Sequence, residues 1–143
     1  GGEADVTFDS AGALMSGALA RLQKKKKEWE DFFCVLSCKN RDDHAAGGHV
    51  DFAYKLDLFE SKADAAANRD PLEGVHVQGA AVKFVQGTVF TVKTTGELNK
   101  KGMTHFVSAN SVEETREWLA ALEMVPEVTV NWTGQDGIEL ERS

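Results

Sequence analysis

Short runs of alternating apolar and polar residues fill most of the chain, and each run predicts a β-strand. The clearest run covers residues 50–61, where Phe52, Tyr54, Leu56 and Leu58 fall on one face. A period of two is the pattern of a half-buried strand. Further strands are predicted at residues 30–38, 72–79, 80–87, 88–95 and 103–109. Residues 16–23 fit a strand by alternation and a helix by their alanine and leucine content.

The pattern changes to a helical period at Asn110. Five residues share one face of a helix predicted over residues 110–123: Val112, Thr115, Trp118, Leu119 and Leu122. Ser111 and Glu114 have the spacing of a capping box, and Pro126 stops the helix. Seven short strands followed by one amphipathic helix predict a mainly β fold, a bent sandwich or barrel whose open corner the helix closes.

The polar segments at residues 39–49, 62–71 and 96–102 are predicted to be loops. A length of 143 residues favours a single domain. We expect residues 1–15 to form a flexible lead-in, residues 16–124 to form the domain, and residues 125–143 to form a C-terminal extension. Val128, Val130 and Trp132 alternate, so the extension either packs as an extra strand or leads to another domain.

Composition places the chain among ordinary globular proteins and limits its chemistry. Hydrophobic residues make up 42% and charged residues 27%, without an apolar stretch near the roughly 18 residues of a membrane span. Cys34 and Cys38 lie four apart on a predicted strand, where we expect buried free thiols and a reducing, cytoplasmic setting. Neither a catalytic motif nor a metal-ligand spacing of histidines is visible, so we expect a non-enzyme without cofactor or metal.

The charge of the chain is unevenly distributed. A net charge of −7 argues against nucleic-acid binding. Even so, Arg21 and Lys24–Lys27 place five positive charges within seven residues, whereas residues 123–143 carry a net negative charge. Such asymmetry can orient a domain on an anionic surface. The basic segment is therefore either a solvated hairpin tip or the rim of a site for anionic head groups.

Taken in order, these segments resemble the pleckstrin homology (PH) domain over roughly residues 16–124. The resemblance is carried by GALAR (17–21), WEDFFCVL (29–36), LDLFES (56–61), LEGVHV (72–77) after Pro71, FTVKT (90–94), and HFVSANSVEETREWLAAL (105–122) with Trp118. It implies a seven-stranded sandwich capped by a C-terminal helix, and a binding module. In that family the open end lies between the loops joining strands 1–2, 3–4 and 6–7, which are here residues 24–29, 62–71 and 96–102.

The resemblance implies a lipid-binding set at this open end: Arg21, Lys24, Lys25, Lys26, Lys27, Trp29, Lys62, Lys100 and Lys101. The chain also departs from the family. Glu30 and Phe32 stand where phosphoinositide-binding members carry a basic-x-Arg pair, and Glu60 stands at a position that is often basic. Lysine supplies a compact charge without the planar fork of arginine. We therefore expect phosphatidic acid or a general anionic surface rather than a polyphosphorylated inositide.

The resulting hypothesis is a cytoplasmic signalling module that associates peripherally with membranes. An anionic leaflet attracts each basic residue by roughly 1 kcal/mol, so a few lysines give only weak binding. We expect a second signal, either an acyl chain elsewhere in the protein or a partner protein. The alternative is a protein–protein interaction PH domain that has no lipid role.

Overall fold

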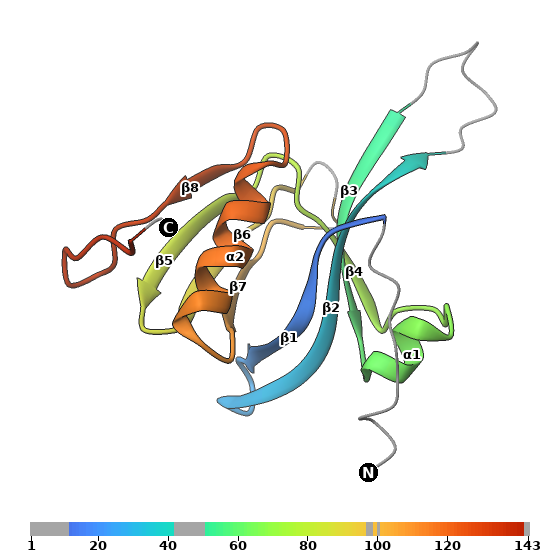
Figure 1. Ribbon diagram of the computed structural model, residues 1–143, viewed down its shortest axis with the longest axis horizontal. Helices are drawn as coiled ribbons and strands as arrows, with labels where there is room; N and C mark the ends of the chain where they lie inside the picture. Colours follow the sequence, from blue (N-terminus) through green and yellow to red (C-terminus); the bar gives the residue numbers. More distant parts are fainter. Residues whose placement is uncertain (1–11, 42–50, 97–98, 100, 142–143) are drawn as a thin grey trace.

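The computed structural model describes residues 12–41, 51–96, 99 and 101–141, and their strands join in one open β-sheet (Figure 1). The eight strands are β1 (Ala13–Gln23), β2 (Glu28–Arg41), β3 (Asp51–Phe59), β4 (Glu73–His76), β5 (Ala81–Gln86), β6 (Val89–Lys93), β7 (Thr104–Ser108) and β8 (Thr129–Asn131). Their order across the sheet is β4-β3-β2-β1-β7-β6-β5-β8. The predicted mainly β architecture with a C-terminal helix is confirmed.

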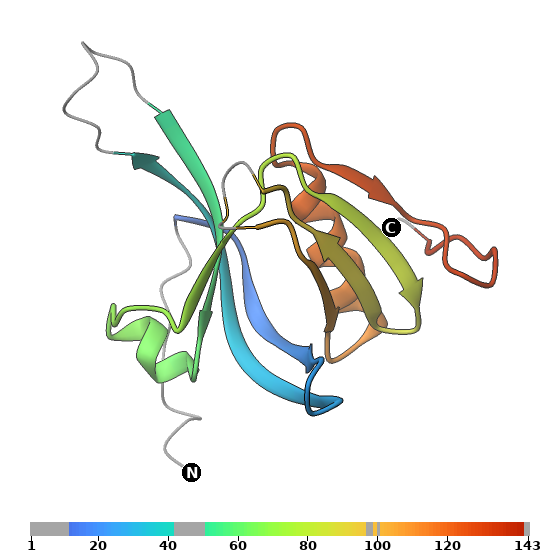
Figure 2. The ribbon, with the colours of Figure 1, turned by 180° about the vertical axis from the view of Figure 1, so that it is seen from behind.

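The first half of the sheet is a long antiparallel ladder of β1 to β4. Met15 to Gln23 pair residue by residue with β2, so the strand alternative for this segment is the correct one. β1 begins at Ala13, before the expected start of the domain at Ser16. β2 and β3 extend beyond the other strands as a long arm (Figure 2).

The two halves of the sheet meet only briefly. β1 pairs with β7 at two positions, Ala20 with Ser108 and Arg21 with Val107. Beyond Arg21 the two strands are not paired, although β1 continues to Gln23 and β7 begins at Thr104. This divergence creates the space in which the candidate site lies.

Helix α2 (Val112–Glu123) contacts β1, β5 and β8. Trp118 and Leu119 are fully buried in the core, and the Trp118 ring lies against Gly17 of β1. Ser111 caps the helix by accepting a hydrogen bond from the Glu114 backbone N–H. The Glu114 carboxylate accepts from the Asn110 N–H, one residue before the partner expected in a capping box. Val112 was expected on the buried face, but its side chain is 43% exposed.

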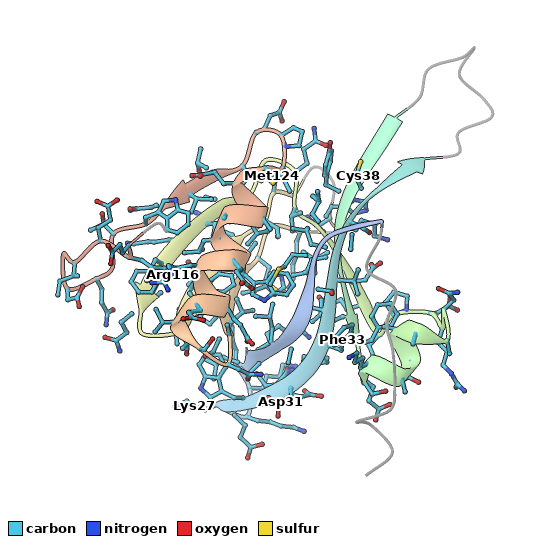
Figure 3. All side chains as sticks on the ribbon, viewed as in Figure 1. Lys27, Asp31, Phe33, Cys38, Arg116 and Met124 are labelled. Atoms are coloured by element: carbon cyan, nitrogen blue, oxygen red, sulfur yellow. The ribbon has the colours of Figure 1, made fainter. Side chains whose placement is uncertain are left out.

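The predicted loop at residues 62–71 instead begins with a short helix, α1 (Lys62–Ala66). Ser61 caps it by accepting a hydrogen bond from the Asp64 N–H. Ala65 packs with Val35 and Phe59, and Phe33 borders this small cluster on the side of β2 that faces α1 (Figure 3). The polar composition of the segment concealed a helix that three alanines and an N-cap serine favour.

The C-terminal extension continues the sheet. β8 pairs in parallel with β5, Trp132 and Leu140 are buried, and the Trp132 indole N–H donates to Glu123 of α2 over 3.1 Å. In the described part of the chain, none of the helices has the length and apolar character needed to cross a membrane.

Candidate functional site

A cleft of about 480 Å³ opens where β1 and β7 diverge. Its β1 side is formed by residues 21–26, which run from the end of the strand into the hairpin turn. The opposite side consists of Met103, Thr104 and His105 at the start of β7. Glu30 of β2 and Glu73 of β4 complete the lining. The cleft therefore combines residues that are far apart in the sequence.

The β1–β2 turn presents its lysines to this cleft. The Lys27 N–H donates to the Gln23 carbonyl over 2.7 Å and closes the turn around Lys24, Lys25 and Lys26. Those three lysines are exposed and line the cleft. Lys27 does not line it; it lies at the hairpin tip, with a left-handed φ of 55° (Figure 3).

Arg21 lies at the inner end of the cleft and is held by two neighbours. Its Nη1 donates to the Glu73 carboxylate over 2.9 Å, and its guanidinium carbon lies 5.1 Å from the centre of the Phe32 ring. The side chain of Arg21 is 16% exposed, against 42% for Glu73. Phe32 is buried, so it supports the guanidinium from below rather than touching a ligand.

Carboxylates moderate the positive charge of the cleft. Arg21, Lys24, Lys25 and Lys26 contribute four positive charges, and Glu30 and Glu73 contribute two negative charges, so the lining is net positive on a chain of net charge −7. The Glu30 carboxylate accepts a hydrogen bond from the Gln23 side-chain amide over 2.7 Å. The two acids therefore engage different partners on β1.

His105 borders the same charged cluster. Burial lowers the pKa of His105 below its ordinary value of 6.5, and the charges of Arg21 and Lys24 lower it further while Glu73 opposes them. The imidazole is consequently neutral at pH 7. A neutral ring adds no charge to the cleft but can still donate or accept a hydrogen bond.

A second groove of about 470 Å³ adjoins the cleft and is lined by Lys101 together with residues of β4. Glu73, Met103 and His105 line both spaces. Asn99 fixes the β6–β7 connection to β4, because its side chain accepts from the His76 N–H and donates to the His76 carbonyl, each over 3.1 Å. Lys101 therefore borders a groove that shares Glu73 with the cleft.

The structure places the residues predicted from sequence in different regions. Arg21, Lys24, Lys25 and Lys26 line the cleft, and Lys101 lines the adjoining groove. Trp29 is 46% exposed on β2 and lines neither space. Lys62 is exposed on α1, which lies well away from the hairpin tip in Figures 1 and 2. Lys100 lies outside the described residues.

Sequence reasoning missed Glu73 and His105 as members of the site. Glu73 is 52 residues from Arg21 along the chain, and only the pairing of β4 with β3 brings it near. Within the described residues, no group of three or more His, Cys, Asp or Glu side chains is arranged to hold a metal ion. The lining of the cleft therefore combines basic side chains with two carboxylates.

Several solved PH domains share this fold. The C-terminal PH domain of pleckstrin in complex with D-myo-Ins(1,2,3,4,5)P5 is 22% identical, covers 80% of this chain and 98% of its own, and has a TM-score of 0.56. The Slm1-PH domain in complex with inositol-4-phosphate is 18% identical, covers 80% and 97%, and has a TM-score of 0.58. The Slm1-PH domain in complex with phosphoserine is 18% identical, covers 78% and 92%, and has a TM-score of 0.55.

Comparisons at the level of sequence give no match, either to a protein-family model or to a curated protein. The structural likeness therefore identifies the fold. The side chains of the cleft must decide what this chain can bind.

Proposed function

From the pleckstrin homology fold, we propose that this chain is a binding module that docks its lysine-lined cleft on anionic phospholipid head groups at a membrane surface. The observation that supports this most is the grouping of Arg21 with Lys24, Lys25 and Lys26 around one cleft. A cluster of positive side chains attracts anions even when the net charge of the whole molecule is negative.

The side chains favour a phosphate monoester, such as that of phosphatidic acid, over a polyphosphorylated inositide. Known structures of the fold hold both classes, since their ligands include an inositol pentakisphosphate, inositol-4-phosphate and phosphoserine. Here the Arg21 fork is engaged by Glu73, and Glu30 adds a second negative charge. The free cations are lysines, which bind phosphate as point charges without the bidentate geometry of arginine.

The expected attraction is modest. Roughly 1 kcal/mol for each basic residue near an anionic leaflet gives about 3 kcal/mol for Lys24, Lys25 and Lys26 together. Binding of this size is reversible and weaker than a stable anchor requires. A partner protein or an acyl chain elsewhere in the protein would supply the second contact.

A vesicle panel at two salt concentrations tests this proposal. The chain is sedimented with phosphatidylcholine vesicles that contain phosphatidic acid, phosphatidylserine or phosphatidylinositol 4,5-bisphosphate, matched for total surface charge. We expect binding to phosphatidic acid to equal or exceed binding to the bisphosphate, and we expect all binding to fall as salt rises.

The panel also separates the proposal from the protein-interaction alternative. Binding that is absent from every anionic vesicle at low salt would contradict a lipid role. A clear preference for the bisphosphate that persists at high salt would contradict the monoester assignment and leave the lipid role intact.

A further inference from the structure

The Arg21–Glu73 ion pair lies where the inner end of the cleft would receive a phosphate group. Arg21 is the deepest cation of the cleft, and its Nη1 already donates to Glu73 over 2.9 Å. A phosphate oxygen and a carboxylate oxygen compete for the same guanidinium N–H groups. A head group that reaches Arg21 must therefore displace Glu73 or share the guanidinium with it.

The neighbours of Arg21 limit the ways in which it can leave this pair. Its guanidinium lies over the Phe32 ring, and its side chain is only 16% exposed, so it cannot swing freely towards solvent. Glu73 is more exposed, at 42%, and its strand β4 lies at an edge of the sheet. Of the two partners, Glu73 is the one with room to move.

Glu73 also borders both basic parts of the site. It lines the cleft with Lys24–Lys26 and the adjoining groove with Lys101. A polyphosphorylated ligand that reached from the cleft into the groove would meet this carboxylate, which lines both spaces. A single phosphate held by the exposed lysines does not need to approach it.

We propose that Glu73 is a specificity-determining residue that occupies Arg21 and so restricts the cleft to head groups with a single phosphate. This inference rests on the proposed function and names the part of the site that selects among phosphate ligands. Glu73 acts as an internal counter-ion, and neutralising it frees the planar fork that polyphosphate recognition uses.

Glu30 provides a matched control within the same cleft. Its carboxylate also lines the space, but it accepts from Gln23 and not from Arg21. Glu30→Gln and Glu73→Gln remove the same charge from the same lining. Only Glu73→Gln removes the charge that holds the Arg21 guanidinium.

The test uses calorimetry with two soluble probes, inositol-4-phosphate and D-myo-inositol 1,2,3,4,5-pentakisphosphate. We expect Glu73→Gln to tighten pentakisphosphate binding about tenfold relative to the parent chain, the effect of freeing one charged hydrogen-bonding group. Glu30→Gln should tighten it less. We expect each of the two substitutions to change inositol-4-phosphate binding less than Glu73→Gln changes pentakisphosphate binding.

A double-mutant cycle with Arg21→Gln supplies the remaining control. The gain from Glu73→Gln should disappear when Arg21 is also replaced, because the gain acts through that guanidinium. Melting temperatures verify that each variant is folded.

Equal effects of Glu73→Gln and Glu30→Gln would overturn the inference, as would a gain that survives loss of Arg21 or a Glu73→Gln variant that gains nothing. These outcomes are independent of the vesicle panel, which uses only the unaltered chain. Failure of the lipid proposal and failure of the Glu73 assignment are thus distinguishable.

Discussion

The chemistry of the cleft depends on which side chains surround each charged group. Arg21 was predicted from sequence as a member of the lipid-binding set, and it lines the cleft. Its engagement with Glu73 could not be predicted, because the two residues are 52 apart and no local pattern links them. The sequence shows that Phe32 stands where phosphoinositide-binding PH domains carry a basic residue. The position of the Phe32 ring against the Arg21 guanidinium follows only from the register of β1 with β2.

His105 should make the stability of the fold depend on pH. Its pKa is lowered in the folded state, first by burial, so below pH 6.5 the unfolded chain binds more protons than the folded one. The contribution of His105 to stability is therefore fully present above pH 6.5 and is lost as pH falls from there through the lowered pKa of the folded state. Urea denaturation of the parent chain and His105→Asn, at pH 7.5 and pH 5.5, should show a greater loss for the parent.

A difference between parent and variant that stays constant over this range would contradict the assignment. The other titrating groups are common to both proteins, so their contributions largely cancel in the comparison.

The two thiols should react at very different rates. Burial raises the pKa of Cys34 to about 12, whereas Cys38 is only partly buried on the same strand. Because the thiolate is the reactive form, Cys34 should resist a thiol reagent at pH 8 until the protein unfolds. Labelling of Cys38→Ser should be slow and accelerated by urea, and labelling of Cys34→Ser should be fast. Similar native rates for the two variants would contradict the buried position of Cys34.

Helices and strands could be predicted from the sequence where the helical or alternating pattern was long. The β2 and β3 runs and the α2 stripe were recognisable from periodicity alone. β1 stayed ambiguous because its alternation predicts a strand whereas its alanine and leucine content favours a helix, and its pairing with β2 decides the matter. α1 was missed because five helical residues give little periodicity, and its stability comes from contacts of Ala65 with Val35 and Phe59.

The lysine turn carries a backbone conformation that lysine does not favour. Lys27 has a φ of 55°, in the left-handed region where a Cβ atom is costly. Lys27→Gly should raise the free energy of unfolding by about 0.5–1 kcal/mol. Lys26→Gly is the matched control, since φ at Lys26 is not positive and glycine there only adds unfolded-state entropy.

Urea denaturation of the two variants measures the difference. A loss of stability for Lys27→Gly equal to that for Lys26→Gly would show that the turn is not held in the left-handed form.

At the scale of the whole molecule, β8 completes the sheet beside β5 and packs the C-terminal extension against α2. The alternation of Val128, Val130 and Trp132 suggested a strand, but parallel pairing with β5 had no signal in the sequence. Non-local pairing of this kind is set by the space that the earlier elements leave. The open edge of β5 and the buried Trp132 together define that space.

Trp132→Ala should destabilise the entire domain. The side chain is 4% exposed within the main core, so its removal leaves a large cavity that costs about 3 kcal/mol or more. Trp132→Phe keeps most of the packing but loses the hydrogen bond to Glu123, so it should cost clearly less. Urea denaturation should give this order, and a Trp132→Ala variant as stable as the parent would show that the extension is dispensable.

Charge distribution decides how the molecule meets a surface. Lys25 and Lys26 lie in the cleft lining, whereas Lys83 and Lys93 are also exposed, on β5 and β6, and line neither space. Lys25→Ala/Lys26→Ala and Lys83→Ala/Lys93→Ala therefore remove the same charge from different places. The most direct measurement is sedimentation of both variants with vesicles containing phosphatidic acid. The account predicts that the cleft variant loses most binding while the other variant retains it, and equal losses in the two variants would contradict docking through the cleft.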